Sequence, residues 1–321
     1  MIIKKNIAIV TGGDSEEYSI SIKSAQNVFN NLNQELFVPY LIELKNKKWQ
    51  LLNHNNSSID KNTFTLNIEQ KNIKIDLIFM ALHGSPAENG EIQSFFDNLK
   101  IPYTCCNSEV SELTFNKFKC NKLLERKGYN IAKSILHNND NNIDLNDIFS
   151  KLTLPLFVKP NQAGSSNGIS KIKKKDALLK AVKLASIHDK NIIIEEEIKG
   201  VEISCGVIRI KNNIHALEIT EIISNNEFFD YDAKYNNESN EITPARITKK
   251  STELVKNISK KIYEDLKLKG ICRIDYILSE DKPYIIEINT IPGFSEKSII
   301  PQQVIASGYN LKDFFSFCLE I

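Results

Sequence analysis

Four polar side chains alternate with apolar ones in two neighbouring segments near the end of the chain. They are Arg273 and Asp275 in "GICRIDYIL", and Glu287 and Asn289 in "PYIIEINTIPGFSEKS". Both segments have the period-two pattern of a β-strand, which places alternate side chains on one sheet face. Magnesium in nucleotide enzymes is held by one or two carboxylates together with substrate phosphates. The residues suit a magnesium phosphate site, although either short pattern taken alone is more often an exposed face with ordinary salt bridges.

A glycine turn directly follows the second strand. It contains Gly293 within "PGFSEKS". Glycine lets backbone N–H groups approach a substrate closely, and such groups can stabilise a developing oxyanion. The turn strengthens the interpretation of the two strands as a reaction site.

A second motif, "VKPNQAGSSNGISK", has the composition of a phosphate-binding loop. Lys159 ends a strand, and the loop that follows contains Gly164, Ser165, Ser166 and Gly168. Backbone N–H groups of such a loop can surround phosphate oxygens, while the lysine adds a point charge. The lysine precedes the glycines, so this is not a Walker A motif, and such a loop taken alone is more often a hairpin connection. Lys159 before it and the predicted metal site later in the chain favour phosphate binding.

Three successive glutamates end an apolar strand in "IIIEEEIKGVE". This pattern is most simply a solvated strand edge. If the strand instead borders a nucleotide cleft, its backbone can pair with adenine while Glu202 accepts hydrogen bonds from ribose hydroxyls.

These motifs require a layered α/β protein to position them. The opening segments "KNIAIVTGG", "SIKSAQNVFNNL" and "FVPYLIEL" have the pattern of a βαβ unit, and "IDLIFMALHG" is a further buried strand. Residues 1 to about 106 are thus predicted to form a small parallel-sheet domain, in which ligands bind beyond the strand carboxyl ends. The segments "GGDSEEYSIS" and "HGSPAENGEIQ" fall at those ends.

Composition narrows the function classes. The chain has 321 residues and a formal net charge of +1, which gives no global field to attract nucleic acid. Its six cysteines contain no C-x-x-C pair and are expected to be free thiols in a reducing compartment. We find no signal peptide and no apolar run that approaches the ~20 residues of a membrane helix, so we expect a cytoplasmic protein without membrane partners.

Seven motifs in order resemble the D-alanine–D-alanine ligases of the ATP-grasp superfamily, over essentially the whole chain. The resemblance implies an α/β protein with an ATP-grasp fold and an N-terminal Rossmann-like sheet. It places the first D-alanine site in residues 1–107, the phosphate loop in a central lobe over 108–197, and the metal site with an omega loop in 198–321. The motifs are "GGDSEEYSIS", "HGSPAENGEIQ", "VKPNQAGSSNGISK", "EEEIKGVEIS", "FFDYDAKYNNES", "RIDYIL" and "IIEINTIPGFSEKS".

The activity implied by the resemblance is ligation of two D-alanine molecules through a D-alanyl phosphate made from ATP, for peptidoglycan synthesis. Asp275, Glu287 and Asn289 match the ligands of two magnesium ions, which manganese can replace. The residues implied in ATP binding are Lys117, Lys159, Ser165, Ser166, Glu195, Glu197, Ile198, Glu202 and Asn289. Relatives of this kind are commonly homodimers, so we expect the same here.

The resemblance also implies roles at the amino-acid sites. Glu17 resembles the residue that holds the ammonium of the first D-alanine, with His83 nearby. Arg273 and the N–H of Gly293 would stabilise the tetrahedral oxyanion. Ser298 and Lys234 would receive the carboxylate of the second D-alanine.

The segment "FFDYDAKY" resembles a loop that closes over the site and excludes water. Tyr235 would form a hydrogen-bonded set with Ser165 and Glu17. Relatives that make D-alanyl-D-lactate lack this tyrosine, so Tyr235 favours an amine nucleophile. A ligase that takes D-serine or D-lactate as its second substrate, and a nucleotide-binding protein without catalysis, are the alternatives.

Several positions depart from the family pattern. The frequent "GEDG" is "AENG" here, a common glutamate before the phosphate loop is Ala163, and the aromatic that often flanks adenine is Glu197. A frequent histidine near the second substrate is Lys297. None of these departures removes a metal ligand or an oxyanion donor.

Overall fold

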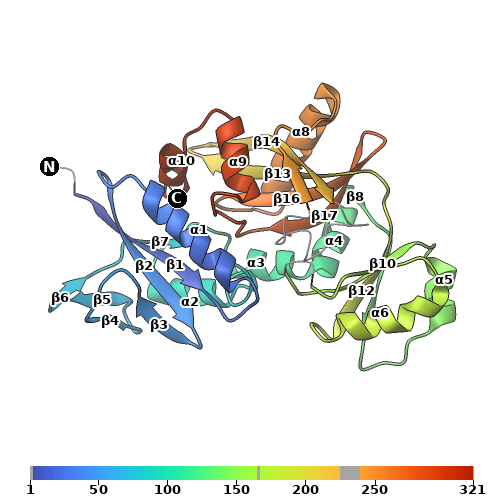
Figure 1. The fold of residues 1–321 in the computed structure, drawn as a ribbon, viewed down its shortest axis with the longest axis horizontal. Helices are drawn as coiled ribbons and strands as arrows, with labels where there is room; N and C mark the ends of the chain where they lie inside the picture. Colours follow the sequence, from blue (N-terminus) through green and yellow to red (C-terminus); the bar gives the residue numbers. More distant parts are fainter. Residues whose placement is uncertain (1–2, 165–166, 225–238, 321) are drawn as a thin grey trace.

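The computed structural model describes residues 3–164, 167–224 and 239–320. Its helices and strands form a mixed α/β structure, as the sequence predicts. Figure 1 shows the N-terminal elements in blue on one side, the C-terminal elements in orange and red above, and the yellow-green elements of the middle of the chain on the other side.

The N-terminal sheet has the strand order β3-β2-β1-β7, with β2, β1 and β7 parallel. Alternate residues of β1 pack against α1 on one face and α2 on the other, so the strand is apolar throughout. The βαβ opening predicted from the sequence is present. The elements are β1 (Lys5–Gly12), α1 (Tyr18–Asn31), β2 (Phe37–Lys45), β3 (Lys48–Leu51), β7 (Leu77–Met80) and α2 (Glu91–Leu99).

A small antiparallel sheet, for which the sequence motifs gave no expectation, lies beside this one. Its strands are β4 (Ser57–Asp60), β5 (Thr65–Ile68) and β6 (Lys71–Ile73). Trp49, Phe64 and Phe96 join the two sheets in an aromatic cluster, in which the Phe64 and Phe96 ring centroids are 5.0 Å apart and nearly perpendicular.

The middle of the chain forms an antiparallel sheet of order β11-β10-β12-β9. One face packs on α5 and α6 through Leu156, Val158, Ile192 and Ile194. The polar segment "LHNNDNNIDLND" begins inside β9, and Asp144 caps α5 by accepting from the backbone N–H of Asn146. The elements are β9 (Ser134–Asn138), α5 (Leu145–Lys151), β10 (Leu156–Pro160), β11 (Ser170–Ile172), the 3-10 turn Lys175–Ala177, α6 (Leu178–Ala185) and β12 (Asn191–Glu196).

The largest described sheet has the order β15-β14-β13-β16-β17-β8. The two helices that follow the N-terminal sheet, α3 and α4, pack on β17 of this sheet. The strands are β8 (Asn130–Ile131), β13 (Val201–Ile210), β14 (Asn213–Ser224), β15 (Ser239–Ile242), β16 (Cys272–Ser279) and β17 (Lys282–Asn289). The helices are α3 (Ser108–Phe115), α4 (Lys117–Arg126), α8 (Lys249–Asp265), α9 (Ile299–Ala306) and α10 (Leu311–Cys318).

The C-terminal helices return to the N-terminal sheet. Phe79 of β7 contacts Phe294 and Phe315 edge to face, with centroid distances of 5.5 and 5.8 Å. These rings belong to one buried cluster that also contains residues of α1 and α10. The turn after β17 is therefore fixed against the N-terminal strands, at the ends where the sequence predicts ligand binding.

Candidate active site

The four polar residues of β16 and β17 share one sheet face, as their spacing predicts. Asp275 lies directly opposite Glu287, and Arg273 lies opposite Asn289. The Arg273 guanidinium donates to Asp275 at 2.9 Å from Nε and 2.7 Å from Nη2, and Asn289 Nδ2 donates to Asp275 Oδ2 at 3.0 Å. Ser204 of β13 also donates to Asp275. This hydrogen bonding orients the Asp275 carboxylate and, because Asn289 uses its amide nitrogen here, its amide oxygen is not the atom engaged with Asp275.

Electrostatics stabilise the charged form of Arg273. Burial opposes the charge on its guanidinium, but Asp275 and Glu287 outweigh that cost, so the pKa of Arg273 is raised above its ordinary value. A cation is therefore fixed beside the two carboxylates at any working pH.

Lys117 connects three parts of the site. Asn116 caps α4 by accepting from the backbone N–H of Lys119, which places Lys117 at the first position of the helix. Its Nζ donates to the carbonyl oxygen of Ala163 at 2.7 Å and lies 3.4 Å from Glu287 Oε2. One ammonium thus bridges the glycine-containing loop and β17.

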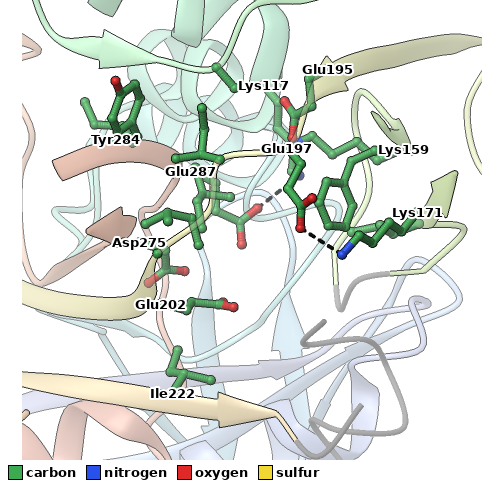
Figure 2. Close-up of a pocket in the computed structure, with 18 of the residues that line it drawn as sticks. Lys117, Lys159, Lys171, Glu195, Glu197, Glu202, Ile222, Asp275, Tyr284 and Glu287 are labelled. Carbon is green, nitrogen blue, oxygen red and sulfur yellow. Dashed lines mark hydrogen bonds and ion pairs between the residues drawn. The ribbon is translucent and has the colours of Figure 1, made fainter. Parts of the chain in front are cut away.

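The other sheet presents a row of charged residues toward the same space. Phe157 of β10 lies between Lys171 of β11 and Glu195 of β12 in the sheet register. Lys159 Nζ lies 2.6 Å from Glu195 Oε1, and Lys171 Nζ lies 2.7 Å from Glu197 Oε1. Figure 2 shows these side chains facing Asp275 and Glu287 across the cavity.

Between the two sheets lies a cavity of about 820 Å³. Its volume is that of a typical small-molecule site. Charged and apolar residues both line the cavity. The apolar lining includes Ala132, Pro155, Phe157, Ile198, Ile222, Ile277, Tyr284 and Ile286. Ile198 and Glu202 both line this cavity, which is where the sequence predicts adenosine to bind.

A second cavity of about 1080 Å³ adjoins the first. The two share Lys117, Ala163, Gly164, Arg273 and Glu287 in their linings. The second is also lined by residues that the sequence assigns to substrate binding and oxyanion stabilisation. These are Glu17, His83, Gly293 and Ser298, and the lining also includes Asn289, one of the predicted metal ligands.

Two glycines allow the loops to approach Glu17. A Cβ at Gly164 would lie 2.6 Å from Glu17 Oε2, and one at Gly84, whose φ is +73°, would lie 2.8 Å from the same oxygen. Glu17 lies immediately before α1, so its carboxylate meets the glycine-containing loop and the turn after His83. Neither glycine can be replaced without moving this carboxylate.

His83 is a positioning residue in this structure. Its Nδ1 donates to the carbonyl of Ile291 at 2.8 Å, because a carbonyl can only accept, and this fixes Nε2 as the acceptor from Ser24 Oγ at 2.8 Å. The backbone N–H of Phe294 donates to Ser24 Oγ at 3.0 Å. Burial lowers the pKa of His83, so the ring is neutral and ties α1 to the turn that contains Gly293.

Gly293 and Ser298 come together in that turn. A Cβ at Gly293 would lie 2.7 Å from Ser298 Oγ, and Ser295 Oγ lies 2.7 Å from the same hydroxyl. Ser298 is the residue immediately before α9, where backbone N–H groups favour a carboxylate.

Glu88 also lines the second cavity, and sequence reasoning did not select it. Burial and the Glu17 carboxylate raise the pKa of Glu88 to about 8, while Lys117 acts in the opposite direction. Glu88 is the glutamate of "AENG", in the motif that follows His83, so its place within a predicted ligand-binding segment could have identified it. The raised pKa of Glu88 depends in part on Glu17 and Glu287, which come from other elements, so the motif alone does not reveal it.

Four predicted site residues, Ser165, Ser166, Lys234 and Tyr235, lie outside the described residues. Over residues 3–164, 167–224 and 239–320, no group of three or more His, Cys, Asp or Glu side chains forms a metal cage. All six cysteines lie in these ranges, and all are buried and free. In the same part of the chain no helix combines the length and apolarity needed to cross a membrane.

Comparison with known proteins identifies the family. Residues 6–106 match the D-ala D-ala ligase N-terminus, and residues 123–320 match the D-ala D-ala ligase C-terminus. The D-alanine–D-alanine ligase of Christiangramia forsetii is 42% identical over 320 residues, with 99% of this chain and 98% of the relative covered. That of Phocaeicola vulgatus is 40% identical over 321 residues, with 99% of each chain covered.

Solved structures give the same result. The VanG D-Ala:D-Ser ligase from Enterococcus faecalis superposes with a TM-score of 0.89 at 30% identity and covers 99% of each chain. The D-alanyl-alanine synthetase A from Vibrio cholerae has a TM-score of 0.88 at 25% identity, with 100% of this chain and 98% of that one covered. The paired cavities and the shared polar face of β16 and β17 thus occur in a chain whose two halves both match one enzyme family: this protein belongs to the D-alanine–D-alanine ligases, with their ATP-grasp fold.

Proposed function

We propose that this chain joins two D-alanine molecules into D-alanyl-D-alanine at the expense of ATP. ATP phosphorylates the carboxylate of the first D-alanine, and the amine of the second attacks the acyl phosphate, which releases ADP and phosphate. The dipeptide serves peptidoglycan precursor synthesis. The observation that carries the proposal is the pair of adjoining cavities, which share Lys117, Arg273 and Glu287, where phosphoryl transfer would occur.

The second cavity supplies groups of the right charge for two zwitterionic substrates. Glu17 would hold the ammonium of the first D-alanine at the mouth of the glycine-containing loop. Arg273 and the N–H of Gly293 would stabilise the tetrahedral oxyanion, because a preformed cation and N–H donor are most effective where charge develops. Ser298 would receive the carboxylate of the second D-alanine at the start of α9.

The donor set on β16 and β17 suits magnesium. Asp275, Glu287 and Asn289 provide two carboxylates and one amide oxygen on directly paired strands, which suffices for an ion that also binds substrate phosphates. Two magnesium ions, or manganese in their place, would be held by these three residues. The metal would neutralise the charge that the phosphates share during transfer.

The nucleophile is an amine in this proposal. Tyr235, with Ser165 and Glu17, would close the loop over the site and exclude water from the acyl phosphate. Lys234 would assist Ser298 with the carboxylate of the second substrate. Because VanG is named as a D-Ala:D-Ser ligase, D-serine is the competing second substrate to test.

We also propose the cytoplasm as the location and a homodimer as the assembly, with membranes and nucleic acid excluded as partners. Six buried free thiols support a reducing compartment. The division into residues 1–107, 108–197 and 198–321 belongs to the same proposal, with α3 and α4 packed on the C-terminal sheet. Light scattering of the purified chain tests the assembly.

The function is tested by phosphate release from ATP with magnesium and D-alanine, with the products identified by mass. L-alanine alone and mixtures of D-alanine with D-serine or D-lactate provide the comparisons. Dipeptide formation with D-alanine alone supports the proposal. If the mixed product with D-serine dominates at equal concentrations, the second-substrate assignment is wrong, and if no substrate releases phosphate, the ligase assignment is wrong.

A further inference from the structure

A buried side chain of α9 bridges an irregularity in the largest sheet. The pairing of β13 with β14 shifts register between Cys205 and Val207, and α9 packs on both strands (Figure 1). Gln303 Oε1 accepts from the backbone N–H of Gly206 at 2.9 Å, and its Nε2 donates to the carbonyl oxygen of Ser204 at 2.8 Å. Because a carbonyl only accepts and an N–H only donates, these partners fix the orientation of the amide. Gln303 therefore anchors α9 to the backbone of β13.

Ser204 connects this anchor to the proposed metal site. It lies directly opposite Asp275 in the sheet register, and its hydroxyl donates to Asp275 Oδ1. Arg273 and Asn289 donate to the same carboxylate from β16 and β17, so Ser204 adds a contact from a third strand. Ser204 and Gln303 are both fully buried, and water cannot replace their contacts without a change in packing.

The same helix begins at the second cavity. Ser298, which lines that cavity, is the residue immediately before α9. Gln303 lies five positions later, ~8 Å along the helix axis. One helix thus has Ser298 at its start and, about one and a half turns later, the amide that holds Ser204. A polar path of three side chains, those of Asp275, Ser204 and Gln303, runs from the sheet face to α9.

A carboxylate that binds a metal ion must present its oxygens in one direction. Groups that hydrogen-bond to a metal ligand fix its orientation, and their loss weakens metal binding. Ser204 can act in this way on Asp275 because its own position is fixed twice, by the pairing of β13 with β16 and by the amide of Gln303. A role in stability alone would leave metal affinity unchanged when either side chain is removed.

We propose that Ser204 and Gln303 are positioning residues for the metal site: Ser204 orients the Asp275 carboxylate, and Gln303 holds Ser204 in place from α9. This rests on the proposed function in that Asp275 is taken as a metal ligand. The affinity of the site for a divalent cation then depends on a helix that carries none of the proposed metal ligands.

The test uses Mn²⁺ alone as the probe, with the full-length chain and with neither nucleotide nor D-alanine. Electron paramagnetic resonance measures the free ion and gives the dissociation constant. Removing a group that orients a metal ligand typically costs ~10–100-fold in metal affinity, so Ser204→Ala should weaken Mn²⁺ binding by that factor. Ser259→Ala removes an equally buried hydroxyl, which contacts Tyr276 next to Asp275 on β16, and should leave the dissociation constant unchanged.

A double variant tests whether Gln303 acts through Ser204. Gln303→Leu should also weaken Mn²⁺ binding, and its combination with Ser204→Ala should bind no more weakly than Ser204→Ala alone. Losses that add in the double variant would overturn this path. Val304→Ala truncates a fully buried side chain of the same helix outside the polar path, so it should destabilise the fold and leave Mn²⁺ affinity unchanged.

Unchanged Mn²⁺ affinity in Ser204→Ala would overturn the role of Ser204, and unchanged affinity in Gln303→Leu would overturn that of Gln303. Asp275→Asn separates these results from a failure of the metal assignment. If Asp275→Asn weakens Mn²⁺ binding and Ser204→Ala does not, the positioning role alone is wrong. If Asp275→Asn binds Mn²⁺ as wild type does, or if wild type binds none, the metal assignment fails together with this inference.

Discussion

Glu88 should make the stability of this protein depend on pH in a direction unusual for a carboxylate. Burial in the second cavity and the nearby Glu17 raise its pKa from 4.5 to about 8, and Glu287 adds to this increase. Lys117 and Arg273 act in the opposite direction. Between these pH values the unfolded chain is ionised at Glu88 while the folded chain keeps the proton. Stability is then fully present below pH 4.5 and falls as pH rises toward 8.

The size of the effect follows from the shift. Each pKa unit corresponds to ~1.4 kcal/mol, so the 2.5 units between pH 4.5 and pH 7 set an upper bound of roughly 3–4 kcal/mol. The corresponding bound at pH 5 is below ~1 kcal/mol. Solvent entering the open cavity reduces both values. Glu88→Gln keeps the shape of the side chain without the charge, so its advantage over wild type should grow across this range.

Urea unfolding of nucleotide-free protein at half-unit steps from pH 5 to pH 8 measures the difference in free energy of unfolding. Taking the difference between variant and wild type cancels the separate effect of His83, whose lowered pKa makes stability fall below pH 6.5 in both proteins. Glu112→Gln, an exposed carboxylate on α3, should leave the wild-type profile unchanged. Parallel profiles for Glu88→Gln and wild type would refute the reasoning.

Three further outcomes follow from the site. Arg273→Ala should lower kcat by ~10²–10³-fold, the cost of one oxyanion donor, and a change confined to KM in steady-state assays would contradict that role. Asn289→Ala should raise the magnesium concentration needed for half-maximal turnover, which a magnesium titration with saturating ATP checks, and an unshifted titration argues against a metal ligand. Gln303→Leu should lower the free energy of unfolding by roughly 2–4 kcal/mol, because its buried amide accepts from Gly206 N–H and donates to Ser204 O. The exposed Ile305→Ala on the same helix is its stability control, and similar urea midpoints for the two would show that the buried amide is not needed.

Much of the site was predictable because it follows from sequence patterns within single strands. The period of two in β16 and β17 places Arg273 and Asp275 on one face whatever the rest of the fold does, and the same holds for Glu287 and Asn289. The strand before the glycine-containing loop likewise fixes Lys159 at its end. The βαβ opening followed from apolar runs long enough to be covered on both sides.

What escaped prediction depends on contacts between distant segments. The ion pair between Lys171 and Glu197 forms because β11 pairs with β10, which brings Lys171 beside a residue 26 positions later in the sequence. The pKa of Glu88 is raised partly because the fold brings Glu17, from another element, close to it. The strands β4 to β6 have few apolar positions each, and their burial comes from the aromatic cluster around Trp49 rather than from their own pattern.

The ion pairs of the site connect metal and nucleotide binding. Lys117 lies against Glu287, and Arg273 against Asp275, so the cations that would face the phosphates and the oxyanion are already paired with the two proposed metal-binding carboxylates. A carboxylate that coordinates magnesium neutralises its lysine or arginine less fully, which makes that cation available to a substrate. Each ligand therefore favours the other, and the coupling must be reciprocal because both act on the same pairs. With Asp275 and Glu287 on the proposed metal, Lys117 and Arg273 would turn more of their positive charge toward the substrates.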